Sequence, residues 1–381
     1  MSTLRQYVAI FLLPAILFGY AAYSNAFVLL SGGTKDKVAE LGSVSMSGML
    51  DGEVTKDLDS LYKRELPHRD AAVGLAGNAR YALFGTGRKG VVVGSDGWLF
   101  TNEEFRQIGR FEIEDAVLHI AEVKSKLAEM GVTLVVLPLP AKSDVYREFL
   151  PKRVKYNVMA ATYADFLSAL GASGIHAVDT RSTLLAEKDK HEVFLRSDTH
   201  WSPFGANVTA RAADSELRAL GIELTPGQIA LLQKPPVSIW GDLTKYITLP
   251  EYASEIGLKP ESVAQFRTQM ESQEASLDLF GDNVPVSVML VGTSYSANEN
   301  WSFVDYLRQA LSVDVVNVAK EGLGPGIPMM ELLNSDILSV TKPKIVFWEF
   351  PVRYLGTPSL WKREKPAGNG HETKTAGGGN A

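Results

Sequence analysis

The sequence contains no cysteine, and this absence excludes several kinds of chemistry. A chain without thiols has no disulfide framework, no thiolate metal site and no cysteine nucleophile. Positive charge is not in excess either, since 38 lysine and arginine residues face 44 aspartate and glutamate residues, for a net charge of −6. We therefore expect no general attraction for nucleic acid. With 381 residues, 45% of them hydrophobic, the chain can bury a substantial core as one large domain.

Charged side chains are also missing from the N-terminal stretch Tyr7–Leu30, which is long enough to cross a bilayer. Arg5 flanks this stretch on its N-terminal side. Pro14 and Gly19 suit a membrane span better than the interior of a soluble helix, so a buried core helix is the poorer interpretation. The sequence thus predicts a transmembrane helix within residues 1–30.

Two fates are open to this N-terminal helix. Ser24-Asn25-Ala26 loosely resembles a signal peptidase site, and cleavage there would release a periplasmic protein. The apolar stretch continues past this site as Phe27–Leu30, which favours a retained signal anchor in the inner membrane. In either case the rest of the chain is expected outside the cytoplasmic membrane, in the periplasm.

After a polar linker at 31–55, short apolar runs alternate with helical patterns, as in βαβ units. The predicted strands are Thr133–Leu137, a short run near His176, Val286–Val291, Val313–Val318 and Ile345–Phe350. The predicted helices are Asp70–Phe84, Ile113–Leu127, Ala160–Leu170, Pro203–Leu220, Trp301–Leu311 and Pro328–Leu338. A hairpin is predicted at Lys89–Phe100. This alternation indicates an α/β domain at 56–364, with a mostly parallel sheet flanked by helices. Pro235–Asp282 fits the rhythm poorly and is expected to be an excursion over the surface, whereas 365–381 is expected to be a disordered tail.

The segment SDTHWSPFGA, residues 197–206, places an acid and a histidine just before a predicted helix. Ser202 suits the N-cap and Pro203 the first helical position, so Asp198 and His200 fall on the preceding loop. Residues two apart in an extended segment point to the same side. If the loop curls enough, the Asp198 carboxylate can orient the imidazole and stabilise its protonated form, which would make His200 a general base.

The segment VGTSYSAN, residues 291–298, follows a predicted buried strand and precedes a helix. A serine on such a tight turn is pushed outward, with free backbone N–H groups beside it. Gly292 would permit the turn, and Ser294 would supply a nucleophilic hydroxyl and an N–H group for an oxyanion hole. Ser296 stands where a strict G-x-S-x-G elbow has its second glycine.

Each of these segments also has an ordinary structural interpretation. Gly-Thr-Ser after a strand is often a turn with a capping serine, and Asp-x-His before a helix is often a hydrogen-bonded pair in a loop. A metal site with His191, Asp198 and His200 as ligands is a further alternative, but their spacing is not a recognised metal motif.

Taken together, four segments resemble the AlgJ/AlgX family of alginate O-acetyltransferases, which is related to the SGNH hydrolases. They are DTHW at 198–201, GTSYS at 292–296, the hairpin KGVVVGSDGWLF at 89–100 and WEFPVRYL at 348–355. The resemblance extends from about Leu50 to Leu355. It implies an SGNH-like fold with Ser294 as the nucleophile, His200 as the base and Asp198 as the acid that orients the base. The Asp-x-His spacing and the order Asp, His, Ser match this branch and depart from general SGNH hydrolases.

This resemblance implies an extracytoplasmic polysaccharide O-acetyltransferase, which moves acetyl through an acetyl-serine intermediate to hydroxyls of alginate or a similar glycan. An AlgI-type membrane acyltransferase is the implied acetyl donor, and the chemistry requires no metal, nucleotide or other cofactor. AlgX carries a C-terminal carbohydrate-binding module, whereas this chain ends soon after its last predicted strand, so the resemblance is closer to AlgJ. Two alternatives stay open: a carbohydrate acetylesterase with the same triad, and a noncatalytic component of a polysaccharide secretion complex.

Four residues near these motifs are candidates for substrate binding. Trp201, Tyr295 and Trp301 are suited to stacking on sugar rings, although ordinary packing explains such aromatic residues equally well. Lys142 follows the predicted strand Thr133–Leu137 and is a candidate for contact with a uronate carboxylate, unless it is simply solvated.

Overall fold

The computed structural model describes most of the chain. The described residues are 12, 14–16, 18–27, 51–52, 55–56, 59–60, 66, 69–152, 154, 158–270 and 287–361. Much of the expected membrane segment, most of the linker and the whole tail at 365–381 lie outside this part. In the part of the chain that is described, every helix is too short or too polar to span a bilayer.

The chain divides into two compact units, which are described separately. The smaller unit comprises Met1–Phe84 and Thr248–Ile256, and the larger comprises Gly85–Ile247 and Gly257–Ala381. The sequence placed all of 56–364 in one domain.

In the smaller unit, helix α5 (Arg69–Phe84) packs on α11 (Pro250–Ala253), as expected for the predicted helix at Asp70–Phe84. Asn78 on the buried side of α5 donates from Nδ2 to the carbonyl of Tyr252 at 2.9 Å. A side chain at Gly74 would collide with the ring of Tyr252. This glycine therefore sets how closely the two helices approach.

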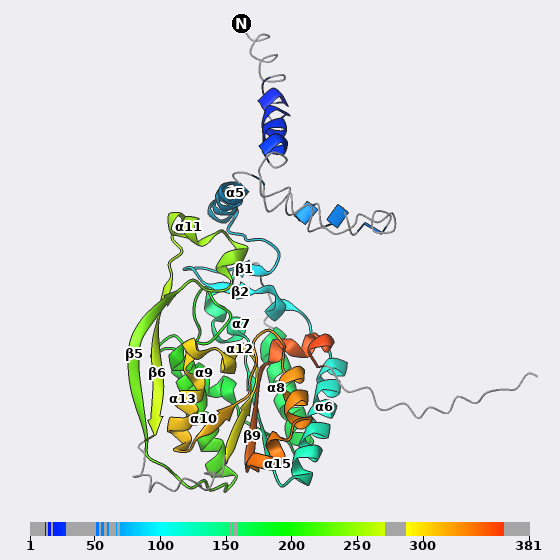
Figure 1. The fold of residues 1–381 in the computed structure, drawn as a ribbon, viewed down its shortest axis with the longest axis vertical. Helices are drawn as coiled ribbons and strands as arrows, with labels where there is room; N and C mark the ends of the chain where they lie inside the picture. The colour runs from blue at the N-terminus through cyan, green and yellow to red at the C-terminus, as the bar shows by residue number, and fades with distance from the viewer. Residues whose placement is uncertain are drawn as a thin grey trace, which may run out of the picture. The chain divides into compact units, whose positions relative to one another are not determined.

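Five parallel strands form the main sheet of the larger unit, within the described residues. In spatial order they are β4 (His176–Ala177), β3 (Thr133–Leu139), β9 (Ile345–Pro351), β7 (Val288–Val291) and β8 (Val315–Asn317). All their pairings are parallel, which confirms the parallel sheet predicted from the alternation of strands and helices. The last strand among the described residues, β9, lies in the middle of the sheet, between β3 and β7 (Figure 1).

Helices cover both faces of this sheet (Figure 1). One face carries α9 (Thr180–Glu187), α10 (Pro203–Ala219) and α13 (Phe303–Leu311), and the other carries α6 (Arg110–Glu129), α8 (Val158–Ala172), α14 (Gly326–Leu333) and α15 (Ile337–Thr341). Alternate strand residues point to opposite faces, so Phe347 of β9 packs in the first core and its neighbour Trp348 in the second. Because both faces are buried, the strands consist of continuous apolar runs.

Helix α10 begins where the sequence predicts. Ser202 is its N-cap and accepts a hydrogen bond from the N–H of Gly205 at 3.1 Å, and Pro203 is the first helical residue. A side chain at position 205 would collide with the carbonyl of Val193. The start of α10 is therefore held close to the backbone that precedes Asp198.

The predicted hairpin at Lys89–Phe100 is also present, as β1 (Val91–Val93) paired with β2 (Leu99–Thr101). Asp96 and Gly97 have φ angles of 53° and 79° at its turn. The left-handed backbone conformation is one that glycine and aspartate adopt more readily than most residues, which explains the Asp-Gly pair here.

Two expectations about the larger unit are corrected. The stretch Pro235–Asp282, expected to be an excursion over the surface, contains a strand that was not predicted, β6 (Glu261–Met270), which pairs with β5 (Ile229–Ile239) in an antiparallel ribbon. Its register is irregular where β5 contains Pro235 and Pro236, because proline lacks the N–H that the ladder needs.

The second correction concerns Pro328–Leu338, which the periodicity predicts as one helix. The structure has two helices here, α14 and α15, separated by a turn at residues 334–336. The other predicted strands and helices of the larger unit are present with shifted ends.

Candidate active site

Residues singled out from the sequence come together at the carboxyl edge of the main sheet. Ser294 begins the short helix α12 (Ser294–Ala297) just beyond β7, and Lys142 begins α7 (Lys142–Val145) just beyond β3. Open parallel sheets bind ligands at this edge, because the connections that follow the strands converge there.

His200 lies between Asp198 and Ser294. Its Nε2 is 2.7 Å from Ser294 Oγ, and its Nδ1 is 2.6 Å from Asp198 Oδ1. Both contacts fit one tautomer, in which Nδ1–H donates to the carboxylate and Nε2 accepts from the serine hydroxyl. Ser294 is half-buried, and the side chains of His200 and Asp198 are 12% and 6% exposed. Three side chains from two distant segments thus form one hydrogen-bonded chain.

The loop that carries Asp198 and His200 is curled by its own backbone contacts. An antiparallel bridge between Phe194 and Trp201 closes it. The Asp198 carboxylate accepts from the backbone N–H of His200 at 2.9 Å and from the N–H of Asp242 at 2.9 Å. The curl that would let the Asp198 carboxylate reach the imidazole is therefore present.

Asp198 is buried and stays ionised. Burial alone would raise the pKa of its carboxyl, but the hydrogen bond and charge of His200, together with the N–H groups of His200 and Asp242, lower this pKa below the ordinary value of 3.8. Because folding lowers the pKa, the ionised form adds stability above the ordinary carboxyl pKa. That contribution is lost as the pH falls through the folded-state pKa.

Asp242 is a second support of this loop that the sequence analysis missed. Its carboxylate accepts from the N–H of Thr199 at 2.8 Å and from the Thr199 hydroxyl at 2.7 Å. The adjacent Gly241 lies against the backbone of Ser197, where any side chain would collide. Asp242 lies in the stretch expected to be a surface excursion, and no motif in the sequence marks it.

Lys142 is neither solvated nor placed to meet a substrate carboxylate, so the expectation for this residue was wrong. The side chain is 1% exposed. Its ammonium donates to the carbonyls of Leu195, Arg196 and Asp198 at 3.0, 3.1 and 2.6 Å. Burial lowers the pKa of Lys142 to about 8, although nearby carboxylates act in the opposite direction. Lys142 thus holds the backbone of the loop that carries Asp198.

The three aromatic candidates lie in the packing beneath the catalytic candidates. Trp201, Tyr295 and Trp301 are 0%, 1% and 2% exposed, so protein atoms cover their rings and leave no face for a sugar. Trp301 stacks on the His200 imidazole, with ring centroids 5.1 Å apart and planes at 23°. The Tyr295 hydroxyl donates to the carbonyl of Thr199 at 2.5 Å, which ties the serine turn to the histidine loop.

Arg353, in the closing WEFPVRYL segment, supports the same tyrosine. It is buried and donates to the Tyr295 hydroxyl at 2.9 Å and to the carboxylate of Glu103 at 3.1 Å. In the sequence this segment carries only the family resemblance, and no local pattern marks the arginine.

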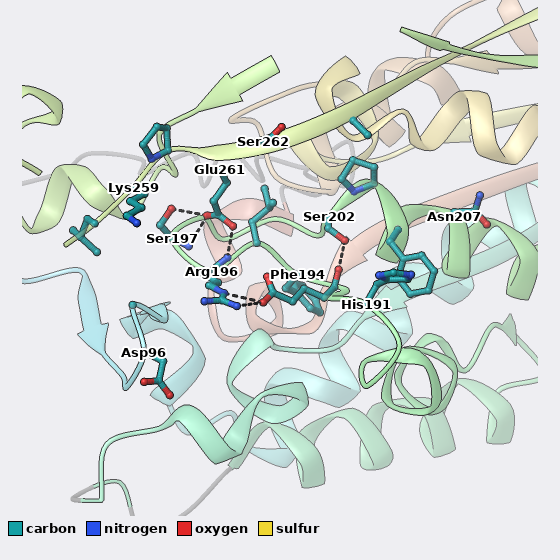
Figure 2. Close-up of a pocket in the computed structure, with 18 of the residues that line it drawn as sticks. Asp96, His191, Phe194, Arg196, Ser197, Ser202, Asn207, Lys259, Glu261 and Ser262 are labelled. Carbon is teal, nitrogen blue, oxygen red and sulfur yellow. Dashed lines mark hydrogen bonds and ion pairs between the residues drawn. The ribbon is translucent and has the colours of Figure 1, made fainter. Parts of the chain in front are cut away.

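A cavity of about 910 Å³ lies beside the loop, and neither Ser294 nor His200 lines it. Its wall includes the residues before Asp198 and the beginning of β6 (Figure 2). There the Glu261 carboxylate accepts from the N–H groups of Arg196 and Ser197 at 2.8 and 2.9 Å. This wall is another support of the loop.

A metal site is the alternative that the histidines raised. Among the described residues, donor atoms of Asp198, His200 and Asp242 lie within 4.8 Å of one another. His191 is not in this group, and its ring packs edge-on against Phe204 at 5.0 Å. Both carboxylates already accept hydrogen bonds from the loop. The carboxylate oxygens that would bind a metal are thus engaged in hydrogen bonds within the protein. The cluster also differs from the predicted ligands, because it contains Asp242 in place of His191.

A helix-flanked parallel sheet with a serine, histidine and aspartate joined at its carboxyl edge is the arrangement of SGNH hydrolase-like proteins. Residues 91–352 match the family described as the SGNH hydrolase-like domain of the acetyltransferase AlgX. The chain belongs to this family.

Individual relatives agree with the family match. The chain is 36% identical over 344 residues to the probable alginate O-acetylase AlgJ of Pseudomonas aeruginosa, covering 88% of each protein. It is 35% identical to the AlgJ of Azotobacter vinelandii over 87% of each. The O-acetyltransferase domain of Pseudomonas putida AlgJ has a similar structure, with a TM-score of 0.63 and 34% identity, over 71% of this chain and 93% of that domain. AlgX of Pseudomonas aeruginosa is more distant, with a TM-score of 0.59 and 26% identity over 72% of this chain and 65% of AlgX.

Replacing Lys142 with methionine tests whether its ammonium holds the loop. Methionine keeps the unbranched side chain as far as the ε position but has no ammonium. The carbonyls of Leu195 and Asp198 then lose their donor, and that of Arg196 keeps only the N–H of Leu99. We expect K142M to lose about 3 kcal/mol of unfolding free energy and to hydrolyse a small acetyl ester more slowly per folded molecule. Chemical denaturation and ester turnover measure the two effects.

The matched control is K188M, because Lys188 donates to the carbonyl of Val145 and to Glu148 near the surface. This change is expected to cost less than about 1 kcal/mol and to leave turnover unchanged. Wild-type stability and turnover in K142M would contradict the assigned support.

Proposed function

We propose that this protein is an extracytoplasmic polysaccharide O-acetyltransferase that works through an acetyl-Ser294 intermediate. The observation that carries the proposal is the continuous hydrogen-bonded chain from Ser294 through His200 to Asp198. In this arrangement the imidazole can take the serine proton while the carboxylate keeps the ring in the required tautomer.

In the first half-reaction, the Ser294 oxygen attacks the acetyl carbonyl of the donor while His200 Nε2 takes the hydroxyl proton. The tetrahedral intermediate then collapses, the bond between the acetyl carbon and the donor oxygen breaks, and His200 returns the proton to that leaving oxygen. In the second half-reaction a sugar hydroxyl gives its proton to His200 and attacks the acetyl carbon. This step releases the Ser294 oxygen, which regains the proton.

The backbone N–H of Ser294 is suited to stabilise the oxyanion of the intermediate. Ser294 is the first residue of α12, a position whose N–H has no partner within the helix. Among the described residues it also has no acceptor outside the helix. An N–H left free beside the nucleophile can donate to the negative charge that develops in the transition state.

Alginate or a similar glycan is the proposed acceptor, because the AlgJ relatives are named alginate O-acetylases. An AlgI-type membrane acyltransferase is the proposed source of acetyl groups. Such a partner and a periplasmic polymer would both be within reach if Tyr7–Leu30 anchors the protein in the inner membrane. A carbohydrate acetylesterase with the same three residues and a noncatalytic secretion component are the competing functions.

Substitution of the nucleophile and the base tests the acyl-enzyme mechanism. S294A is expected to fold normally and to lose ester turnover by a factor on the order of 10⁴ or more, because no other hydroxyl replaces the nucleophile. H200A is expected to lose a similar factor, and the double variant little more than either single variant. Turnover is measured with a small activated acetate ester. A folded S294A protein with wild-type turnover, or losses that simply add, would refute the assignment.

Transfer and hydrolysis are separated by an acceptor assay. A transferase holds the sugar hydroxyl next to the acetyl carbon, and an effective molarity of roughly 10⁵ M or more outweighs water at about 55 M. We therefore expect unacetylated uronate oligosaccharides to gain acetyl groups, which mass spectrometry detects, with S294A as the control for spontaneous transfer. Release of free acetate alone, together with deacetylation of acetylated polymer, would establish the esterase. Failure of both reactions in a folded protein would favour the noncatalytic role.

The proposed anchor makes a separate prediction about membrane attachment. Since hydrophobic attachment does not depend on charge, the full-length protein should stay with membranes after a high-salt wash, whereas a chain that starts near Ser31 should not. Fractionation followed by immunodetection measures this. A mature N-terminus at Phe27 would show that the segment is cleaved instead.

A further inference from the structure

A buried glutamate lies directly beneath the turn that carries Ser294. Glu349, in strand β9, is 0% exposed, and its carboxylate accepts hydrogen bonds from three donor groups of this turn. The N–H of Thr293 donates to it at 2.9 Å, the Thr293 hydroxyl at 3.0 Å, and the Ser296 hydroxyl at 2.8 Å. Donors on both sides of Ser294 therefore converge on one carboxylate.

The position of Glu349 follows from the register of the sheet. Val291 pairs with Trp348, so the next residue of each strand, Gly292 and Glu349, are also neighbours. The alternation of side chains turns Glu349 to the same face as Phe347, where the core also contains Tyr295. This is the face on which the aromatic residues beneath His200 are packed.

The contact with Glu349 also explains why residue 292 is glycine. A Cβ atom at this position would lie 2.5 Å from Glu349 Oε2 and 3.0 Å from Ser296 Oγ. Gly292 is not among the described residues with a positive φ angle, so the turn itself does not require glycine. Residue 292 is glycine because the Glu349 carboxylate occupies the space that a side chain would fill.

Glu349 makes no ion pair with a lysine or arginine within the described part of the chain. Burial raises the pKa of its carboxyl, and the donors from Thr293 and Ser296 and the charge of His200 only partly offset this effect. An apolar residue would avoid this cost in the middle of a strand that is otherwise hydrophobic. A buried acid in an otherwise apolar strand is expected where a functional site needs its carboxylate.

We infer that Glu349 is a positioning residue, which sets the serine turn so that Ser294 Oγ stays within 2.7 Å of His200 Nε2. It acts through Thr293 and Ser296 and contacts neither Ser294 nor a reacting atom. The Thr293 hydroxyl that donates to Glu349 also accepts from the N–H of Tyr295 at 3.4 Å, which extends the support to the residue after the nucleophile. This inference rests on the proposed role of Ser294.

The test is the variant E349Q, which keeps the size of the side chain but puts an NH₂ group where one acceptor oxygen was. With the amide oxygen at the Oε2 position, which accepts from the N–H of Thr293 and the Ser296 hydroxyl, the NH₂ group faces the Thr293 hydroxyl. That hydroxyl then has to accept where it had donated, its hydrogen loses its nearer acceptor in the buried turn, and we expect the turn to shift. Because a displacement of about 1 Å can cost on the order of 10²-fold in rate, we expect acylation of Ser294 to slow at least tenfold. The dissociation constant of a small acetate ester, taken from the dependence of the burst rate on ester concentration, should stay within about twofold, because Glu349 is fully buried and does not meet the ester.

Asp305 supplies a matched control. It is 1% exposed, and it accepts from the N–H and the hydroxyl of Thr268, both at 2.8 Å, so its threonine donors are of the same kind as those of Glu349. Asp305 lies on α13 and contacts none of the three catalytic candidates. D305N should therefore lower the thermal midpoint without changing the acylation rate of the folded protein. Thermal unfolding and the pre-steady-state burst are measured for both variants.

An acylation rate in E349Q within twofold of wild type would overturn the inference, whatever its thermal midpoint. If E349Q does not fold, the acylation rate of T293V tests the inference instead. T293V removes one hydroxyl donor to Glu349 and keeps the side-chain shape. At least a fivefold loss supports the inference, and a loss of less than twofold overturns it. A separate measurement tests the proposed mechanism itself. Mass spectrometry locates the acetyl group on the wild-type protein, and acetyl on a residue other than Ser294 would refute that mechanism.

Discussion

The buried ammonium of Lys142 is the interaction on which the arrangement of the site depends. A loop that curls tightly enough to bring the Asp198 carboxylate onto His200 also turns several of its carbonyls to the inside. Three of them, from Leu195, Arg196 and Asp198, converge on Lys142 Nζ. Buried carbonyls need donors, and one ammonium supplies three N–H groups from a single point. Burial makes the charge expensive, as the lowered pKa indicates, but the carboxylates around it reduce that cost.

Several acidic side chains lie at the same edge of the sheet, beside the cations Lys142 and Arg353. Asp198, Asp242 and Glu349 lie around the loop and the serine turn, and each accepts backbone N–H groups. When His200 takes a proton, the new positive charge forms next to the Asp198 carboxylate and over the face of Trp301. These groups are already oriented before the reaction, so little reorganisation is needed as the charge develops. The Trp301 ring and the Asp198 carboxylate therefore both stabilise the imidazolium form of His200.

The helix start and the strands could be predicted from the properties of nearby residues. The residues that support the site were missed because they act through contacts between distant parts of the sequence. Ser202 and Pro203 mark the start of α10 by the properties of those residues alone, and the apolar runs identify strands buried on both faces. The roles of Lys142 and Asp242 depend on neighbours that lie 56 and 44 positions away in the sequence. No local pattern records such a contact.

The ribbon of β5 and β6 was missed for a different reason, because two prolines interrupt the alternation by which a strand is identified. The aromatic residues were ambiguous for a third reason. A tryptophan beside a catalytic motif has the same sequence signature whether its face is open to a sugar or covered by protein. Burial decides between these two, and burial is a property of the whole fold.

The topology of the sheet links the site to the completion of the fold. Strand β9 is the last to be synthesised, yet it lies between β3, which leads to Lys142, and β7, which leads to Ser294. Until β9 is inserted, β3 and β7 have no contact with each other through the sheet, and Glu349 and Arg353 are absent from beneath the serine turn. A sheet without β9 therefore lacks the contact between the two strands that lead to the site. Since β9 supplies both the register between its neighbours and the buried groups that contact the turn, the stability of the fold and the geometry of the site depend on the same strand.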